Sequence, residues 1–305
     1  MSYFKPYIED ILKSCLGSGL KVLDFSFLAA GYSHNIYLVK TNFKTYAVKL
    51  LKEHRDINVL KNTIKAHEIL KDSKVHHPGI VHYDLNPQIG RPLVIHEFVS
   101  GNDLAVEQRN LHISDMQKIF YDLGVYLRKL HNIKGNYFSN DLLYSDKVES
   151  WTKFLFDRLN REIKFIAHTE MINPRDLTEI EKKLNDMIFY SISNGIEPSF
   201  VHRDVHLKNI IINHKKFHSL IDFEIAWFSD PLWDFNKLRV FFFEENKVLE
   251  AGFFAGYQTN KPFNESEKTR LELYKYFEYL WAFRSYYQDP DYKEALKYLD
   301  LLKKI

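Results

Sequence analysis

A short run of strand-like residues inside an otherwise helical region constrains the fold of this chain most strongly. Residues 209–213 and 218–223 are apolar and rich in β-branched or aromatic side chains, and a polar turn separates them. Most of the sequence beyond residue 100 has the apolar spacing of amphipathic helices. The pattern therefore predicts a single hairpin set among helices, with polar and charged residues at both of its ends.

The first hundred residues have a different pattern. We expect a three-stranded meander over 20–30, 35–41 and 45–51, a helix over 57–71, and two further strands over 80–85 and 92–99. The predicted fold class is therefore α+β, with a small antiparallel-sheet lobe that contains one helix and a larger, mainly helical lobe. We place the first lobe at residues 1–97 and the second at residues 98–305.

The helices of the second part are predicted from periodicity and capping signals. Ser114-x-x-Gln117 has the pattern of a capping box, and Asn173-Pro174 supplies an N-cap followed by proline at the first helical position. The expected helices cover 114–131, 151–167, 173–195, 265–287 and 291–302.

Composition excludes several classes of protein. Hydrophobic residues make up 45% of the chain and charged residues 27%, and no apolar run approaches the roughly 18 residues that span a membrane. The start lacks the pattern of a signal peptide, and the single cysteine, Cys15, allows neither an intramolecular disulfide nor a cysteine-based zinc site. We expect a cytoplasmic protein with no membrane partner. The net charge of +2 gives no case for a nucleic-acid partner.

Glycine is scarce, with 11 residues in 305. No Gly-x-x-x-x-Gly-Lys-[Ser/Thr] motif exists, and Gly17-Ser18-Gly19 precedes the first predicted strand and lacks the third glycine of a dinucleotide-binding loop. These two nucleotide-binding folds are therefore excluded.

One constellation of polar residues predicts chemistry. Asp204 is followed by Asn209 five residues later and by Asp222 across the predicted hairpin. Phosphoryl transfer from ATP to an alcohol needs a carboxylate that accepts the hydroxyl proton and oxygen ligands for Mg²⁺. We therefore predict Asp204 as the catalytic base and Asn209 and Asp222 as Mg²⁺ ligands.

The strand-rich part offers a lysine for the phosphates. Lys49 alternates with apolar residues in a predicted strand, so it faces one side of the sheet together with Ala47. Glu68 is four residues beyond Ile64 and is expected on the inward face of the helix, where it would pair with Lys49. Glu53 is the alternative partner.

Two further segments are candidates for nucleotide contacts. The turn after residue 30 offers the backbone of Gly31 and the hydroxyl of Ser33 to phosphates, although a tight hairpin without a ligand remains the alternative. Where the last strand leaves the first lobe, the backbone groups of Glu97 and Val99 are expected to meet the edge of adenine. An ordinary linker is the alternative there.

The motifs together resemble the aminoglycoside phosphotransferase and choline kinase group, small-molecule relatives of protein kinases. The resemblance covers roughly residues 25–240 and rests on AAGYSHNIYLV, YAVKL, the helix with Glu68, LVIHEFVSGNDL, LRKLH, VHRDVHLKNIII and LIDFEIAWFSDPLWDF. It implies a protein-kinase-like fold and the same roles for Asp204, Asn209 and Asp222. It also implies a Lys49–Glu68 pair that holds ATP, and a structural role for Asp234.

Three departures from the related families matter. Arg203 stands where the small-molecule kinases more often have glycine, and Glu224 replaces the glycine of the protein-kinase Asp-Phe-Gly motif. Only 11 residues separate Asp222 from Asp234, which leaves little room for a segment that docks a peptide. A protein kinase is therefore a weaker hypothesis. An inactive nucleotide-binding module is weaker as well, because neither the predicted base nor a predicted metal ligand is missing from the sequence.

The acceptor is predicted as a small-molecule alcohol, with an aminoglycoside-type antibiotic first and choline, an amino alcohol or homoserine as alternatives. A cationic acceptor is suggested by an excess of acidic residues near the motif and by the aromatic Trp281. The acids are Asp222, Glu224, Asp230, Asp234, Glu244, Glu245 and Glu250. An ordinary solvated helix face is the alternative.

Overall fold

The computed structural model describes residues 4–192, 195–258, 261–288 and 292–305. The chain divides into two compact units, and each is described separately below. Unit 1 consists of Met1–Arg109 and Lys208–Ala226, and unit 2 of Asn110–Leu207 and Trp227–Ile305. The hairpin predicted among the helices thus packs with the N-terminal residues. The predicted boundary after residue 97 stays a prediction.

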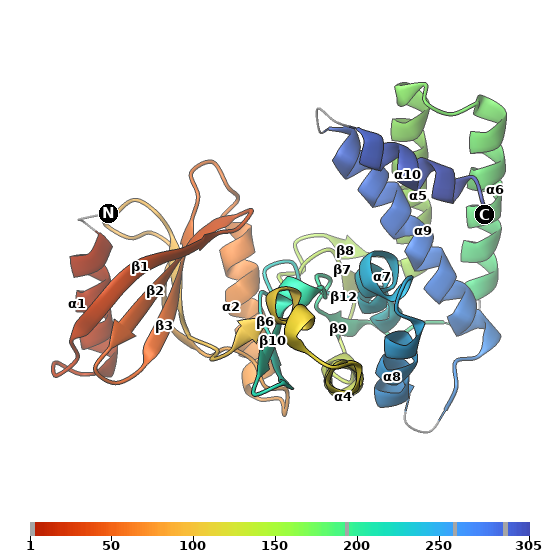
Figure 1. Ribbon diagram of the computed structural model, residues 1–305. Coiled ribbons are helices and arrows are strands. Elements are labelled where there is room, and N and C mark those ends of the chain that lie inside the picture. The colour runs from red at the N-terminus through yellow and green to blue at the C-terminus, as the bar shows by residue number, and fades with distance from the viewer. Residues whose placement is uncertain (1–3, 193–194, 259–260, 289–291) are drawn as a thin grey trace. The chain divides into compact units, whose positions relative to one another are not determined.

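Unit 1 is built on an antiparallel sheet with strand order β1-β2-β3-β5-β4 (Figure 1). The strands are β1 (Val22–Ala30), β2 (His34–Thr41), β3 (Thr45–Leu51), β4 (Ile80–Asp84) and β5 (Leu93–Glu97). All five were expected, and the last one ends two residues early. The helix α2 (Asn58–Lys71) also matches its prediction, whereas α1 (Phe4–Leu16) was not predicted.

The two faces of this sheet pack against different helices. Tyr46, Val48 and Leu50 of β3 lie in the cluster that contains Ile8 and Leu12 of α1. Leu51 packs instead with Leu60 and Ile64 of α2. Because side chains alternate along a strand, Lys49 lies on the same face of β3 as Leu51. The sequence alternation thus places this lysine on the side of the sheet that carries α2.

The predicted hairpin completes unit 1. It consists of β10 (Ile210–Asn213) and β11 (Lys216–Leu220), and β6 (Asn102–Asp103) pairs with β10 at its other edge. The short helix α3 (Leu104–Glu107) follows β6. The second strand ends at Leu220, so that Asp222 lies in the loop beyond the hairpin.

Unit 2 is mainly helical and contains one small sheet of order β8-β7-β12-β9 (Figure 1). Its strands are β7 (Phe138–Ser139), β8 (Lys147–Val148), β9 (Ser199–Val201) and β12 (Trp227–Ser229). Its helices are α4 (Ile113–His131), α5 (Trp151–Thr169), α6 (Pro174–Ser191), α7 (Asn236–Leu238), α8 (Lys247–Gln258), α9 (Glu265–Tyr287) and α10 (Lys293–Leu302). Helices α4, α5, α6, α9 and α10 were expected, and α8 was not.

The helix caps agree only in part with expectation. Asn173 caps α6 as predicted, because its side chain accepts a hydrogen bond from the backbone N–H of Arg175 at 2.8 Å. The capping box at Ser114 is wrong, since α4 begins one residue earlier and has His112 at its N-cap. A capping box does occur at Asn264 and Glu267, where it opens α9.

Aromatic rings build the core of unit 2. The ring centroids of Trp151, Trp227 and Trp233 lie 5.4–5.6 Å apart in edge-to-face pairs. The Trp151 indole N–H donates to the Tyr274 hydroxyl at 2.7 Å, and that hydroxyl donates to Asp230 at 2.5 Å. Trp151 and Tyr274 thus satisfy each other's polar atoms and hold the Asp-Pro-x-x-Asp segment in place through Asp230.

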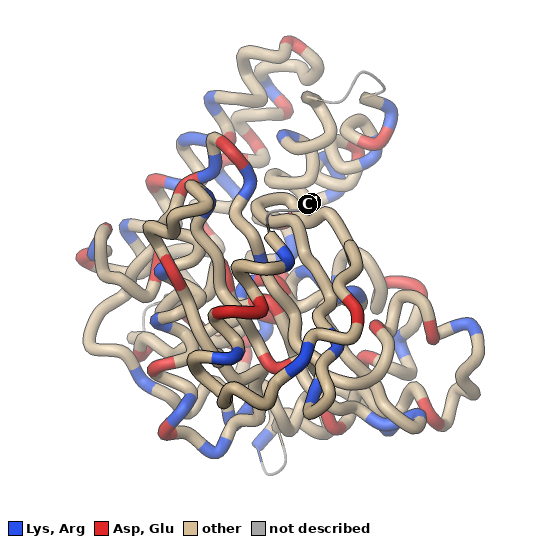
Figure 2. The backbone as a smooth tube through the Cα atoms, turned by 90° about the vertical axis from the view of Figure 1, so that its left-hand side faces the viewer, with Lys and Arg blue, Asp and Glu red and all other residues tan. Residues whose placement is uncertain are grey.

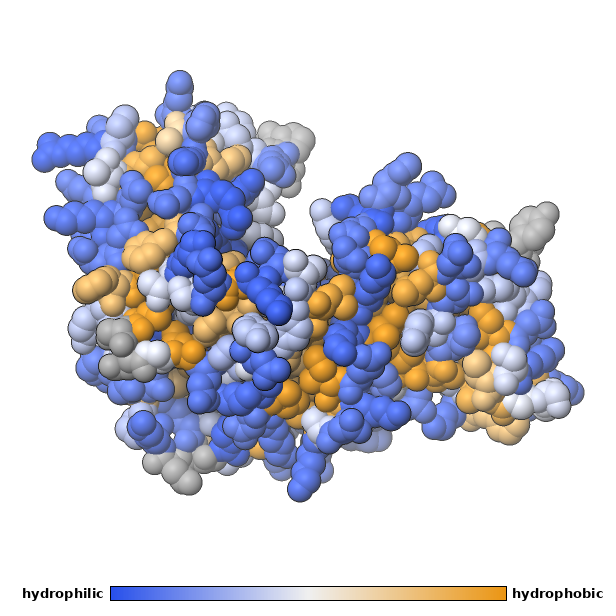
Figure 3. All heavy atoms as spheres, turned by 180° about the vertical axis from the view of Figure 1, so that it is seen from behind, coloured by the Kyte–Doolittle hydropathy of each residue, from blue (hydrophilic) through white to orange (hydrophobic). Residues whose placement is uncertain are grey.

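The surface is mixed in charge and hydropathy. Lysine and arginine are interspersed with aspartate and glutamate along the backbone (Figure 2). On the face drawn in Figure 3, hydrophobic residues lie in patches among hydrophilic ones. Within the described ranges, no helix combines the length and apolar character needed to span a bilayer.

Close packing of α4 against α8 yields a testable prediction. A Cβ added at Gly256 would collide with the carbonyl oxygen of Tyr121, whereas one added at Gly252 would lie 3.4 Å from the carbonyl oxygen of Gln117. We expect Gly256→Ala to lower the free energy of unfolding by about 1–3 kcal/mol, because the helices must separate. Denaturant unfolding measures this change. Gly252→Ala is the control, and equal loss in both variants would contradict the packing argument.

Candidate functional site

Lys49 and Asp222 lie in direct contact within unit 1. The Lys49 Nζ atom is 2.7 Å from Asp222 Oδ1, and their side chains are 12% and 29% exposed. Lys49 comes from the middle of β3, and Asp222 from the loop after β11. Two residues that the sequence assigned to phosphate and to metal are therefore brought together, although their roles stay predictions.

Asn209 and Asp222 are joined through the backbone of the hairpin. The N–H of Ile221 donates to the carbonyl oxygen of Asn209 at 3.0 Å. Asp222 has a φ of +72°, a left-handed conformation that is uncommon for a residue other than glycine and is frequent at functional sites. An amide and a carboxylate held at one end of a hairpin fit Mg²⁺, which takes few protein oxygens and fills its shell with phosphate and water. Among the described residues, no group of three or more His, Cys, Asp and Glu side chains offers an alternative metal site.

Glu224, which the sequence suggested only as one of several acids near a cationic acceptor, joins three segments of unit 1. Its carboxylate accepts from Ser33 Oγ at 3.3 Å and lies 2.9 Å from His34 Nδ1. Its carbonyl oxygen accepts from Asn62 Nδ2 at 3.0 Å, and the same amide group donates to Ala226 O at 2.9 Å. The loop that carries Asp222 is thus tied to the β1–β2 turn and to α2.

The β1–β2 turn has an ordered set of backbone contacts. The Gly31 N–H donates to His34 O at 2.9 Å, and Lys52 Nζ donates to Gly31 O at 2.5 Å. Ser33 is 4% exposed and directs its hydroxyl to Glu224. The predicted phosphate contacts of Gly31 and Ser33 stay predictions.

The expected inward position of Glu68 is wrong. Its side chain is 55% exposed and pairs with Lys65 at 3.0 Å, one turn back along α2. Leu60 and Ile64, which were used for the prediction, are buried. The buried face continues through Ala66 and Leu70 instead of Glu68. A role for Glu68 in nucleotide binding stays a prediction that its position does not support. Glu53, the alternative partner for Lys49, is exposed as well.

The end of β5 carries the candidate adenine contacts. Glu97 is the last residue of the strand, its N–H donates to Gly79 O at 2.9 Å, and its carboxylate pairs with Lys44 at 2.9 Å. Val99 follows two residues later, and both backbone contacts to adenine stay predictions. The neighbouring His96 is buried, and burial lowers its pKa to about 3, so its imidazole is neutral.

Asp204 lies in unit 2 and is flanked by two nitrogen groups. Lys237 Nζ is 2.6 Å from Asp204 Oδ1, and His206 Nε2 is 3.4 Å from Asp204 Oδ2. Burial raises the pKa of Asp204, but hydrogen bonds and charges from His206 and Lys237 outweigh it, so the pKa lies well below its usual range. The carboxylate is therefore ionised and able to accept a hydrogen bond from a hydroxyl.

A second carboxylate holds the turn before Asp204. Asp234 Oδ2 accepts from the N–H of His202 at 2.9 Å, and Oδ1 accepts from the N–H of Arg203 at 2.6 Å. Arg203 has a φ of +69°, and its guanidinium lies 4.2 Å from the Trp227 ring centroid. The contacts agree with the structural role expected of Asp234 and compensate the left-handed backbone of Arg203.

Most of the acidic residues proposed for a cationic acceptor have partners inside their own unit. Asp230 pairs with Arg270 at 2.8 Å, and Glu250 with Arg239 at 3.0 Å. Glu244 accepts from the Tyr279 hydroxyl at 3.1 Å. These carboxylates therefore balance internal charges and buried hydroxyls.

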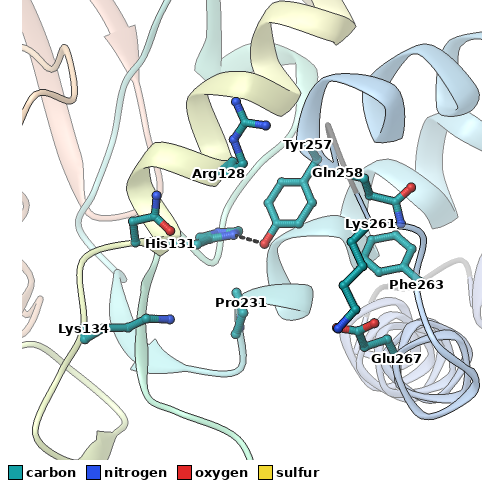
Figure 4. A pocket seen from close by; sticks show the side chains of 10 residues that line it. Arg128, His131, Lys134, Pro231, Tyr257, Gln258, Lys261, Phe263 and Glu267 are labelled. Atoms are coloured by element: carbon teal, nitrogen blue, oxygen red, sulfur yellow. Dashed lines mark hydrogen bonds between the residues drawn. The ribbon is translucent and has the colours of Figure 1, made fainter.

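Unit 2 also contains a cavity of about 210 Å³ at the ends of α4 and α8 (Figure 4). His131 lies at its wall, where Nδ1 is 2.9 Å from the Tyr257 hydroxyl while Nε2 is 3.0 Å from Asp234. Arg128, Lys134 and Lys261 add positive charge to its lining. None of the predicted site residues lines this cavity.

The different positions of Asn62 and Glu68 on α2 give a second prediction. Asn62→Ala removes two hydrogen bonds and leaves two backbone carbonyls without this donor, so we expect a loss of about 1–3 kcal/mol in unfolding free energy. Glu68→Ala is the control on the same helix, and it should change stability by less than about 0.5 kcal/mol. Chemical denaturation compares the two variants. A larger loss for Glu68→Ala would contradict the assigned helix face.

Comparison with known proteins agrees with this fold. The model of the phosphotransferase enzyme family matches residues 24–274. No curated protein matches the chain in sequence.

Solved structures of similar fold cover nearly the whole chain. A gentamicin complex of APH(2'')-IIa is 18% identical, with a TM-score of 0.70 over 98% of this chain and 96% of the other. ADP-bound aminoglycoside phosphotransferase APH(2'')-Ib is 17% identical, with a TM-score of 0.69 over 98% and 97%. A fructosamine-3-kinase from Haemophilus somnus 129PT is 18% identical, with a TM-score of 0.68 over 97% and 96%.

These likenesses confirm the predicted α+β fold of the kinase type. The family model covers most of the chain, including both the lysine strand and the loop of Asp204. The chain belongs to the phosphotransferase enzyme family.

Proposed function

We propose that this phosphotransferase moves the γ-phosphate of ATP to a hydroxyl group of a small molecule. The observation that carries the proposal is the 2.7 Å contact between Lys49 and Asp222. A lysine on a largely buried strand face, matched by a carboxylate in a left-handed turn, suits a triphosphate and its cation. Solved complexes of similar fold with ATP and ADP support a nucleotide as the donor.

Each residue has a proposed part in the transfer. Asp204 accepts the hydrogen bond of the acceptor hydroxyl and then its proton, while Lys49 contacts phosphate oxygens. Asn209 and Asp222 would hold Mg²⁺, which when bound neutralises charge on the triphosphate. The β1–β2 turn with Gly31 and Ser33 would approach the phosphates, and the backbone of Glu97 and Val99 the adenine.

An aminoglycoside-type antibiotic is the proposed acceptor, which would make the enzyme a resistance factor. Solved structures of similar fold hold gentamicin or streptomycin, which supports this choice. Choline, an amino alcohol or homoserine is the alternative. A protein substrate is disfavoured by the 11 residues between Asp222 and Asp234. The single, exposed thiol of Cys15 favours the cytoplasm, and the balanced charge gives no reason for a nucleic-acid partner.

Removal of the proposed base tests this function. Asp204→Asn keeps the size of the side chain but removes its charge, so we expect kcat to fall by about 10²–10⁴-fold. The measurement is acceptor-dependent ADP release from Mg-ATP, with aminoglycosides, choline and homoserine as acceptors. Thermal stabilisation by Mg-ATP should persist in Asp204→Asn and weaken in Lys49→Met. Equal ADP release by wild type and Asp204→Asn would exclude Asp204 as the base.

The lowered pKa of Asp204 predicts the sign of a pH effect on stability. A carboxylate with a depressed folded-state pKa stabilises the fold above its unfolded-state pKa of about 3.9, and this contribution disappears as the pH falls towards the folded value. The difference in unfolding free energy between wild type and Asp204→Asn should therefore shrink below about pH 4. Urea unfolding at pH 7, 5 and 3.5 measures it. A difference that grows towards low pH would contradict the assignment.

A further inference from the structure

Lys237 has an unusual place beside the proposed base. Its Nζ atom lies 2.6 Å from Asp204 Oδ1 and 5.0 Å from the centroid of the Trp281 ring. The lysine side chain is 19% exposed, whereas Trp281 is 39% exposed. The ammonium group is therefore held between a carboxylate and an aromatic face.

A second carboxyl group lies near the same lysine. Glu278 precedes Trp281 by one turn of α9 and is 5% exposed. Its Oε2 atom accepts from the side chain of Asn236, the residue next to Lys237, at 3.0 Å. Burial raises the pKa of Glu278, while the charges of Lys237 and Arg158 oppose that rise. The surroundings of Lys237 thus contain one ionised carboxylate, one buried carboxyl group and one aromatic ring.

This combination is the usual chemistry of ammonium recognition. Carboxylates attract the positive charge, and the face of a tryptophan ring adds cation–π attraction. An aminated acceptor was expected to use Trp281 in this way. In this chain the ring already faces an ammonium group, because Lys237 provides one. A second cation at this position would meet the like charge of Lys237 at short range.

We propose that Lys237 occupies the position of an acceptor ammonium group, so that the enzyme selects acceptors whose reacting hydroxyl has neutral or anionic neighbours. The proposal rests on the proposed function with Asp204 as the base, and it narrows the acceptors named there by removing choline. Polyhydroxylated compounds and hydroxylated acids remain acceptors that fit the proposal. An aminoglycoside fits only through a hydroxyl remote from its amines, and choline does not fit.

Binding of tetramethylammonium tests the proposal without any turnover. The chain has four tryptophans, and Trp151, Trp227 and Trp233 are at most 3% exposed. The indole N–H resonance of Trp281 is therefore an isolated reporter, assigned by Trp281→Phe. In wild type we expect tetramethylammonium chloride to shift it no more than equal sodium chloride. In Lys237→Met we expect tetramethylammonium to shift this resonance saturably, with an apparent dissociation constant at least tenfold below any that wild type shows. The indole resonances of the other three tryptophans should keep their positions, which would show that the core is intact.

Three variants make the result specific. Lys237→Gln also removes the charge and should behave as Lys237→Met does, which guards against a folding defect in either one. Lys237→Arg keeps a cation and should remain insensitive. Lys275→Met is the matched control and should leave the Trp281 resonance as insensitive as in wild type. Lys275 also faces an aromatic ring, that of Tyr276 at 5.5 Å, and pairs with Glu272 at 2.7 Å.

Two outcomes would overturn the proposal. One is equal, saturable binding of tetramethylammonium to wild type and to Lys237→Met, and the other is no binding to either folded neutral variant. A wild-type kcat/KM for choline above that for 3,3-dimethyl-1-butanol, its uncharged analogue of the same shape, would also overturn it. Failure of the proposed function would look different. No acceptor would then increase ADP release, whereas the tetramethylammonium shift of the Trp281 resonance in Lys237→Met would still be observed.

Discussion

The turn before Asp204 depends on hydrogen bonds to the carboxylate of Asp234. That carboxylate is fully buried, and it accepts hydrogen bonds from two successive backbone N–H groups as well as facing His131. A left-handed arginine costs backbone energy, so the turn needs such a compensating contact. Because Asp234 follows Trp233, which packs in the aromatic core, the position of the turn is fixed by packing as well as by charge.

In unit 1, Glu224 holds a loop in place much as Asp234 does in unit 2. One residue uses its carboxylate for the β1–β2 turn and its carbonyl for α2, so that strand, helix and hairpin meet at one short loop. Half-buried hydrogen bonds of this kind reinforce one another where water is scarce. In both units a carboxylate orders the loops around the candidate site residues. The sequence resemblance implied such a role for Asp234 but not for Glu224.

The sequence predicted the strongly periodic elements well and the contacts poorly. The strands of unit 1 and the helices α4, α5 and α6 have clear periodicity. Helix α8 contains two glycines, which lower helical propensity, and α1 was missed although its apolar residues have amphipathic spacing. Glu68 was misplaced because the row through Leu60 and Ile64, which are both buried, does not stay buried one turn further on, at Glu68. Glu224–Ser33 and Lys237–Asp204 join residues 191 and 33 positions apart, for which no local pattern exists. Lys49 and Asp222 were recognisable because their neighbours form motifs.

The pairing of Lys49 with Asp222 has a consequence for the order of ligand binding. A phosphate that engages Lys49 competes with Asp222 and removes part of the positive charge that compensates this half-buried carboxylate. A divalent cation that engages Asp222 alone likewise weakens the charge compensation of the largely buried Lys49. Exchange of both partners at once keeps every charge balanced. Under the proposed function, nucleotide and cation are therefore thermodynamically linked, each raising the affinity for the other by the energy that the broken ion pair would otherwise cost.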